Sequence, residues 1–163
     1  MERLWTPWRR AFVEGAADNA QPGCFLCAIA ADPTQDARNF VLYRATSVFA
    51  LLNLYPYNTG HLMIAPYAHT GDLARLPADI AAELMAGTQR SLTALERAYT
   101  PDGFNIGMNL GRAAGAGVPD HLHVHVLPRW SGDTNFMPIV ADTKVLPESL
   151  DQTYERLEPY FRS

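Results

Sequence analysis

Three of the five histidines of the chain stand at alternate positions of one apolar segment, residues 121–127. In a β-strand, residues i, i+2 and i+4 point to the same face, so we expect His121, His123 and His125 to share a face. Imidazole titrates near neutral pH and can act as a nucleophile, an acid or a base. The pattern therefore predicts a reactive site, although alternate histidines also bind zinc or iron and a solvated strand could carry them by chance.

A glycine-rich segment, residues 109–117, precedes these histidines. Glycines allow backbone N–H groups to approach a phosphate closely. The segment lacks the Gly-Lys-Ser/Thr ending of a P-loop, and a tight connection between two strands would have a similar composition. Because it lies next to three imidazoles, we interpret it as a phosphate-binding loop whose bound phosphate would face the histidines.

The two cysteines, Cys24 and Cys27, form a C-x₂-C pair. Disulfides are rare in cytoplasmic proteins, where we expect this chain to be. The preceding Pro22 and Gly23 do not suggest the strand-to-helix start of a thioredoxin-like redox motif. A zinc site would need two further ligands. From the residues alone, the pair is either half of such a site or two small buried side chains.

Length and composition predict one folded domain. The chain has 163 residues, of which 48% are hydrophobic and 18% charged, and this balance excludes a disordered protein. Thirteen basic and seventeen acidic residues give a net charge of −4, which argues against a broad nucleic-acid surface. No apolar run approaches the ~20 residues of a membrane helix. The opening MERLWTPWRR has no apolar core of a signal peptide, so we expect a cytoplasmic protein.

The hydrophobic pattern predicts the elements that position these residues. Apolar residues recur every three or four positions over 77–99, which indicates an amphipathic helix, and a final helix is expected over about 147–161. The short links between strands favour an α+β fold, with a mainly antiparallel sheet of about five strands and two main helices. Short strands are expected over 39–44, 47–53, 61–65, 104–109 and 121–127, and irregular structure over most of the first forty residues.

The segment 121–127 resembles the signature of the histidine triad (HIT) family, in which three histidines alternate with apolar residues. The resemblance extends over about 24–136. Residues 4–9 and 128–136 resemble the branch that includes bacterial diadenosine tetraphosphate phosphorylases, and also the fragile-histidine-triad branch. The segments that resemble the nucleotide-contacting strands of the family are 49–53, 58–66 and 109–111.

The resemblance implies a nucleotide hydrolase or nucleotidyl transferase that cleaves at an α-phosphate, with a dinucleoside polyphosphate as substrate and either water or phosphate as acceptor. His123 would be the nucleophile that forms a covalent nucleotidyl-histidine, and His125 would stabilise the phosphate oxygens in the transition state. Many relatives carry Gln or Ser in the preceding loop, where this chain has Gly117 and Val118. We therefore expect backbone amides to cradle the α-phosphate there, at Ala116, Gly117 and Val118.

Four further residues would contact the substrate if the family pattern holds. His61 would line the phosphate pocket, Asn53 would hold the ribose hydroxyls, and Asn109 would hydrogen-bond the phosphate side. From spacing alone, both asparagines would instead bond turn backbone, and His61 would be a buried, hydrogen-bonded side chain. Trp130 would stack on the base or pack in the core or an interface.

The resemblance also implies a structural zinc. Several bacterial HIT proteins, and the related galactose-1-phosphate uridylyltransferases, bind zinc through two cysteines, one histidine after the third strand and the first triad histidine. This chain has all four positions: Cys24, Cys27, His69 and His121. In that case His121 would anchor its segment and would not be a catalyst.

The alternatives to a dinucleoside polyphosphate enzyme are a nucleoside phosphoramidate hydrolase and a non-catalytic nucleotide-binding interaction protein. A redox or metal-storage protein would need metal on all three histidines of the triad. The family commonly forms symmetric dimers, and helix 77–99 is a candidate contact. We expect one HIT-like domain over 1–163, with an N-terminal extension over 1–23, a core over 24–136 and a C-terminal segment with a helix over 137–163.

Overall fold

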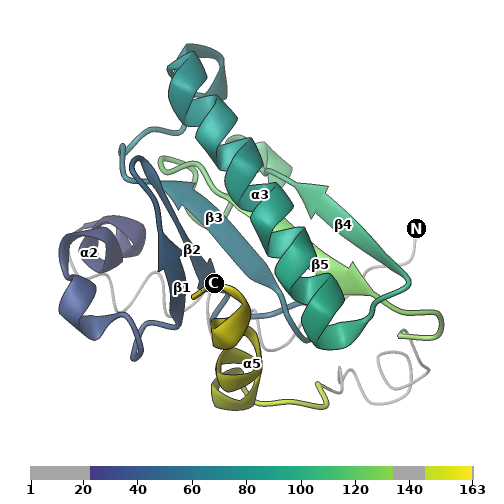
Figure 1. Cartoon of the computed structure of the whole chain (residues 1–163). Helices are drawn as coiled ribbons and strands as arrows, with labels where there is room; N and C mark the ends of the chain where they lie inside the picture. The colour runs from purple at the N-terminus through teal and green to yellow at the C-terminus, as the bar shows by residue number, and fades with distance from the viewer. Residues whose placement is uncertain (1–22, 134–145, 163) are drawn as a thin grey trace.

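The computed structural model describes residues 23–133 and 146–162. Their centre is a five-stranded antiparallel sheet with the order β1-β2-β3-β5-β4 (Figure 1). The α+β fold with a five-stranded antiparallel sheet, which the sequence predicted, is confirmed. The strands are β1 (Val41–Arg44), β2 (Val48–Leu52), β3 (Leu62–Pro66), β4 (Gly103–Gly107) and β5 (Val124–Arg129).

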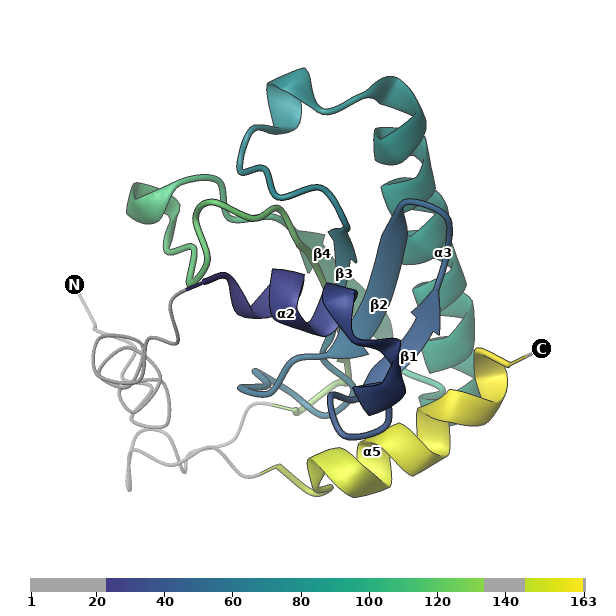
Figure 2. The same cartoon turned by 90° about the vertical axis from the view of Figure 1, so that its left-hand side faces the viewer.

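Helices cover both faces of this sheet. The long helix α3 (Ala78–Tyr99) and the C-terminal helix α5 (Leu150–Leu157) lie on one face, and α2 (Phe25–Ala31) lies on the other (Figure 2). The sheet is therefore the middle layer of the fold, with one face available for each set of packing partners. Short 3-10 helices complete the described residues at Pro33–Gln35, Leu73–Arg75, Arg112–Ala114 and Glu158–Tyr160.

Strand alternation divides the buried side chains into two cores. Ala50 and Leu52 of β2 point toward α3 and α5, whereas Phe49 and Leu51 point toward α2. All five residues of β2 are buried, since this strand has a helix on each side. The larger core lies between the sheet and α3, where Leu95 is fully buried.

The helix ends follow local chemistry. Helix α3 begins after Pro77 and ends at Thr100, whose φ of 48° is left-handed, so the predicted helix over 77–99 is confirmed. The final helix is shorter than the predicted 147–161. It begins at Ser149, whose hydroxyl accepts from the backbone of Gln152 while the Gln152 side chain accepts from the backbone of Ser149. This capping box sets the first turn.

Two further parts of the fold differ from the prediction. The sequence was expected to be irregular around Cys24, yet α2 begins immediately after it. The strand expected over 121–127 begins only at Val124 and continues through Pro128 to Arg129. Its start is delayed because the Leu122 amide donates to the Thr70 carbonyl in the loop after β3, at 2.7 Å.

Proline is tolerated in β5 because of where its backbone points. The amide and carbonyl of one residue face the same side of a strand. The Pro128 carbonyl accepts from the side chain of Asn58 at 3.2 Å, on the side away from β4. The N–H that proline lacks would therefore face a loop and not a neighbouring strand.

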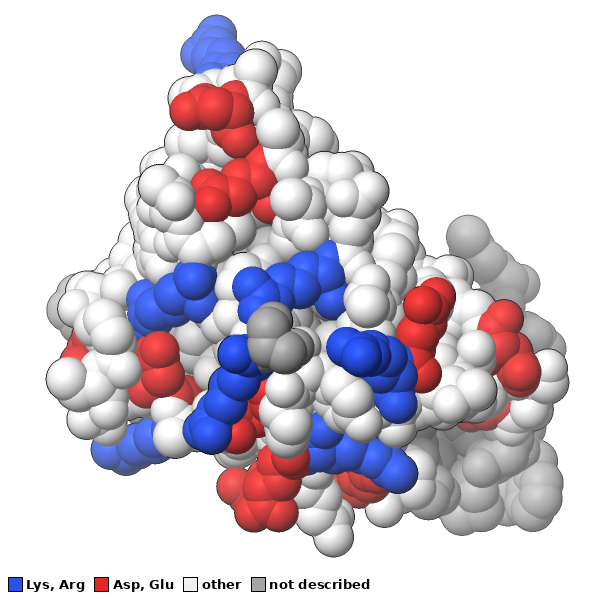
Figure 3. Space-filling model, viewed as in Figure 1, with Lys and Arg blue, Asp and Glu red and all other residues white. Residues whose placement is uncertain are grey.

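No helix within residues 23–133 and 146–162 is long and apolar enough to cross a membrane. The face that carries α3 and α5 displays basic and acidic side chains interspersed with one another (Figure 3). Residues 4–9 and 134–136, which contributed to the resemblance, and the N-terminal extension up to residue 22 lie outside the described residues.

Leu95→Ala should lower the free energy of unfolding by about 2–5 kcal/mol, because it removes a fully buried side chain from the larger core. Met85 on the same helix is 60% exposed, so Met85→Ala should change stability by less than about 0.5 kcal/mol. Urea unfolding measures both. Equal effects of the two substitutions would contradict the described packing of α3.

Candidate active site and metal cluster

Three histidine rings meet where β3 and β5 run side by side. His61 precedes β3, and His125 pairs with Met63 of that strand. The Nε2 atom of His61 lies 2.9 Å from Nδ1 of His125, and the ring centroids of His123 and His125 are 4.7 Å apart. Val124 packs into the core under α3, so the histidines on either side of it face the α2 side of the sheet.

The backbone of Tyr57 determines where His61 carries its proton. The Tyr57 amide donates to Nδ1 of His61 at 3.1 Å. Because an N–H group can only donate, Nδ1 is unprotonated and the proton of the neutral ring is on Nε2. That proton faces Nδ1 of His125, so neutral His125 carries its own proton on Nε2. The Tyr57 ring also stacks on His61, with centroids 4.8 Å apart.

His123 has the opposite arrangement. Its Nδ1 atom lies 2.9 Å from the carbonyl oxygen of His121. A carbonyl only accepts, so in the neutral ring the proton is on Nδ1 and the lone pair is on Nε2. The residue is 6% exposed, and its ring is held by this bond and by the neighbouring His125. His123 Nε2 is therefore an unprotonated nitrogen held in one orientation, as a nucleophile requires.

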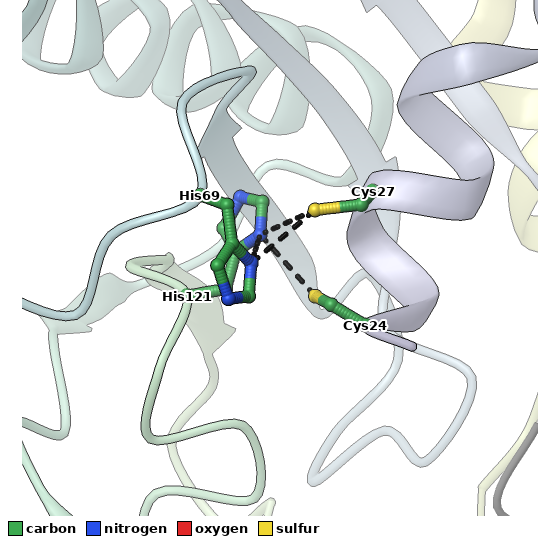
Figure 4. A group of neighbouring side chains, drawn as sticks. All are labelled: Cys24, Cys27, His69 and His121. Carbon is green, nitrogen blue, oxygen red and sulfur yellow. Dashed lines mark hydrogen bonds between the residues drawn. The ribbon is translucent and has the colours of Figure 1, made fainter. Parts of the chain in front are cut away.

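Two cysteines and two histidines form a second cluster (Figure 4). Cys24 caps α2, Cys27 lies in its first turn, His69 follows β3, and His121 precedes β5. Their ligand atoms all lie within 4.8 Å of one another. Nδ1 of His121 is 3.3 Å from Cys24 Sγ and 3.4 Å from Nδ1 of His69, and Nδ1 of His69 is 3.3 Å from Cys27 Sγ.

These separations suit a tetrahedral metal ion. Bonds of about 2.0–2.3 Å to nitrogen and sulfur place the ligands of a tetrahedron roughly 3.3–3.8 Å apart. His121 also has its lone pair in place, because its Nε2 donates to the Pro66 carbonyl at 2.8 Å and leaves Nδ1 free. The donor set and its spacing thus fit a bound cation.

Protonation in the cluster agrees with this assignment. Burial lowers the pKa of His121, against the opposing effect of the Pro66 carbonyl, and the nearby His69 lowers it further. The ring is therefore held neutral, as a metal ligand must be. Burial and the neighbouring Cys24 raise the pKa of the Cys27 thiol in the absence of a cation. A bound metal ion would reverse that effect, because it stabilises thiolate.

Arg44 holds the helix that carries the cysteines. From the end of β1, its guanidinium donates to the carbonyls of Ile29 at 2.7 Å and Ala30 at 3.0 Å, in the last turn of α2. It also forms three bonds to the carboxylate of Asp36, at 2.7, 2.9 and 3.2 Å. The exposed carbonyls of a helix end need such partners. Arg44 therefore fixes α2 on the sheet with Cys24 and Cys27 toward His69.

The model of the HIT domain family matches residues 34–132, a span that includes the three rings and both histidines of the cluster. The chain belongs to the HIT family. A relative from Mycobacterium tuberculosis named AP-4-A phosphorylase is 41% identical over 162 residues, which cover 94% of this chain and 80% of the relative.

Solved structures agree with this assignment. A zinc-bound histidine triad family protein from Mycobacterium smegmatis has a TM-score of 0.68 and 28% identity, covering 86% of this chain and 94% of that one. A hypothetical histidine triad nucleotide-binding protein from Sulfolobus tokodaii has a TM-score of 0.66 and 29% identity, covering 85% of this chain and 89% of that one.

Within this HIT fold, Asn53 lies beside His61. Its Nδ2 is 3.4 Å from Nε2 of His61, and its Oδ1 accepts from the Tyr55 amide at 2.9 Å. Asn53 therefore bonds turn backbone, as its spacing alone predicted, and its contact with the ribose hydroxyls stays a prediction. Asn109 follows β4 two residues after Gly107, which pairs with His125.

The other predicted contacts lie on either side of β5. The loop with Ala116, Gly117 and Val118 leads directly into the histidines, and the Val118 carbonyl accepts from the His121 amide at 3.4 Å. Trp130 follows the other end of β5, where its ring meets the ring of Tyr99 edge-on with centroids 6.1 Å apart. Trp130 thus packs against Tyr99, and its stacking on a base stays a prediction.

A cavity of about 200 Å³ lies elsewhere, between α5 and the loop before His61. Leu52, Leu150 and Thr153 line it together with that loop. These residues belong to the α5 side of the sheet, whereas His123 and His125 face the α2 side. Only His61 borders both regions, so the cavity is not the pocket of the triad.

Sequence reasoning missed several residues that hold the site. Arg44 gave no signal, because a charged residue at a strand end is ordinary. The role of the Tyr57 backbone amide could not be found from residue type, since every residue except proline has one. The partners of Asn58 could not be found either, because Pro128 and Asp133 lie 70 and 75 positions further along the chain.

Arg44→Ala should lower the free energy of unfolding by about 1–3 kcal/mol, because the last carbonyls of α2 and Asp36 lose a partly buried partner. Arg38 is an exposed arginine of the same region, and Arg38→Ala should have an effect below about 0.5 kcal/mol. Urea unfolding under reducing conditions compares the two. If Arg44→Ala is no more destabilising than Arg38→Ala, Arg44 does not hold α2 on the sheet.

Proposed function

We propose that this HIT protein cleaves dinucleoside polyphosphates at an α-phosphate, through a covalent nucleotidyl-histidine on His123. The observation that carries the proposal is the unprotonated Nε2 of His123, oriented by the bond from its Nδ1 to the His121 carbonyl. The 41% identical relative named AP-4-A phosphorylase supports the substrate class.

The reaction has two displacements. Nε2 of His123 attacks the α-phosphorus, a P–N bond forms, and the P–O bond to the rest of the polyphosphate breaks with its electron pair on the leaving oxygen. The ring becomes positively charged, and the bond from Nδ1–H to the His121 carbonyl stabilises it. Water or inorganic phosphate then attacks the same phosphorus, and His123 recovers its lone pair.

The neighbouring groups would stabilise and orient the phosphate. His125 would donate its Nε2 proton to a non-bridging oxygen, where negative charge increases in the transition state. His61 would keep that proton in place from the other side of the His125 ring. Asn53 would bond the ribose hydroxyls, and Asn109 the phosphate side. Backbone amides would cradle the α-phosphate at Ala116, Gly117 and Val118.

The cysteine–histidine cluster is proposed to hold a structural Zn²⁺ through Cys24, Cys27, His69 and His121. Two sulfurs and two nitrogens at these separations are a typical donor set for zinc. The ion would cross-link the four side chains and would take no part in the reaction. Its ligands join α2 to the loops before β5 and after β3, so the cluster would hold the segment on which His123 depends.

His123→Ala should lower turnover of a dinucleoside tetraphosphate by at least about 1,000-fold, because the covalent route requires Nε2. Circular dichroism and nucleotide binding should remain close to those of the unchanged protein, since the ring makes one bond to the backbone, to the His121 carbonyl, and alanine keeps the β5 backbone bonds. Steady-state kinetics measures the loss. Normal turnover in this variant would reject the mechanism.

Substrate and acceptor can be separated in the same assay. Product analysis with and without inorganic phosphate distinguishes a phosphorylase, which releases a nucleoside diphosphate, from a hydrolase, which releases a monophosphate. Cleavage of a nucleoside phosphoramidate in preference to the tetraphosphate would favour the phosphoramidate hydrolase. Tight nucleotide binding without turnover of either compound would favour a non-catalytic interaction protein.

Elemental analysis of the protein purified under reducing conditions should find about one zinc per chain. His69→Ala should reduce the zinc content strongly, because it removes one of four ligands. His123→Ala serves as the control and should retain zinc, since the ring of His123 is not part of the cluster. Zinc well below one equivalent would contradict the proposal, and loss of metal in His123→Ala would favour a metal face on the triad.

The remaining expectations concern the surroundings of the protein. A cytoplasmic location, a homodimer and the absence of a broad nucleic-acid surface stay predictions. Strand β4 at the edge of the sheet supports a dimer, because its outer side pairs with no strand among residues 23–133 and 146–162, and Ile106 on it is 50% exposed. Helix α3 is the other candidate contact.

A further inference from the structure

Asn58 anchors the turn that carries the Tyr57 amide. Its side chain is 7% exposed and donates to the carboxylate of Asp133 at 3.0 Å and to the Pro128 carbonyl at 3.2 Å. Its own carbonyl accepts from the His61 amide at 3.2 Å. Asn58, the residue after Tyr57, therefore links the turn before β3 to the C-terminal end of β5.

Asp133 in turn is held by several donors. Arg129 forms a bidentate pair with it, at 2.6 and 2.8 Å, and the Trp130 amide donates to it at 3.2 Å. The Asp133 side chain is 10% exposed, so these bonds are largely shielded from water. Arg129 is itself fixed to β4 by a bond to the side chain of Asn105 at 2.6 Å. The anchor for Asn58 is thus a rigid part of the sheet edge.

We propose that Asn58 and Asp133 are positioning residues that set the proton positions of His61 and His125. They hold the turn so that the Tyr57 amide stays on Nδ1 of His61, which keeps the His61 proton on Nε2 and directed at His125. The expected effect on turnover rests on the function proposed above. The placement of the protons does not.

The turn needs this anchor because it has little other structure. Residues 53–61 contain no helix or strand. If the Tyr57 amide moves away, Nδ1 of His61 can take a proton, and the ring either changes tautomer or becomes a cation. In the changed tautomer, Nε2 no longer donates to His125. Nε2 of His61 then accepts instead, which favours the His125 proton on Nδ1 and removes the donor that faces the phosphate.

The space around the turn supports a fixed geometry. A side chain at Gly60, whose φ is +75°, would meet Pro128 at 3.0 Å and Leu95 at 3.1 Å. The turn therefore lies directly on β5 and α3, and a small shift of its backbone has no free space on that side. Asn58 holds the same turn from the side of Asp133, so the Tyr57 amide is confined between the two contacts.

The test compares Asn58→Ala and Asp133→Asn with the unchanged protein, using long-range ¹H–¹⁵N correlation spectra of the imidazole rings. In the unchanged protein, His61 should carry its proton on Nε2. Both variants should show a mixture of tautomers or protonation at Nδ1 of His61. Asn39→Ala is the matched control, because Asn39 lies before β1 and takes no part in the bonds of Asn58 and Asp133, and it should leave the His61 spectrum unchanged.

Steady-state kinetics on a dinucleoside tetraphosphate provides the second readout. Both variants should lower kcat by about 10- to 100-fold with little change in KM, as expected for misplaced catalytic groups. The Asn58→Ala/Asp133→Asn double variant should lower kcat by less than the product of the two single effects, because the two residues share one hydrogen bond. Asn39→Ala should retain the kcat of the unchanged protein.

An unchanged His61 tautomer in folded Asn58→Ala and Asp133→Asn would overturn the inference, whatever the activity. If one variant fails to fold, the other decides. If the unchanged protein cleaves no dinucleoside polyphosphate, the proposed function fails, while the spectra still decide whether the anchor sets the tautomer. A fall in kcat with an unchanged tautomer would assign Asn58 a purely structural role and would also reject the proposal.

Discussion

The hydrogen bond from His123 Nδ1 to the His121 carbonyl is the interaction on which the proposed chemistry depends. It leaves the nucleophilic nitrogen of His123 unprotonated, and it requires the His121 backbone to stay in place. The ring of His121 is buried in the cysteine–histidine cluster and bonded to the Pro66 carbonyl. One residue therefore belongs to both sites, through its carbonyl in one and its ring in the other.

The two faces of the sheet serve different purposes, one the stability of the fold and the other the chemistry of the site. Helices α3 and α5 bury one face and provide most of the apolar contacts, while the other face carries the histidines and α2. Helix α2 has only seven residues and would be marginal in isolation. It is held by Leu26 and Ile29 against the sheet and by Arg44 at its end. A metal ion shared with two loops would add a further constraint at its start.

Most of the fold could be predicted because hydrophobic periodicity is strong where elements are long or alternate regularly. Helix α3 and the five strands have such patterns, and their boundaries differ from the prediction by few residues. Helix α2 was missed because its position depends on distant contacts, above all Arg44. The early start predicted for β5 was wrong because Leu122 bonds the Thr70 carbonyl, a partner that alternation along the segment cannot indicate.

The sequence by itself determined which chemical groups the protein has: alternating imidazoles, a C-x₂-C pair and a glycine-rich loop. It also indicated their family, and hence the partners expected in a site. Only the tertiary structure decided which nitrogen of each imidazole carries a proton. That choice depends on whether a donor or an acceptor faces each nitrogen, and the partner of His61 is His125, 64 positions away. Protons follow the three-dimensional arrangement of donors and acceptors, which residue types and spacing do not specify.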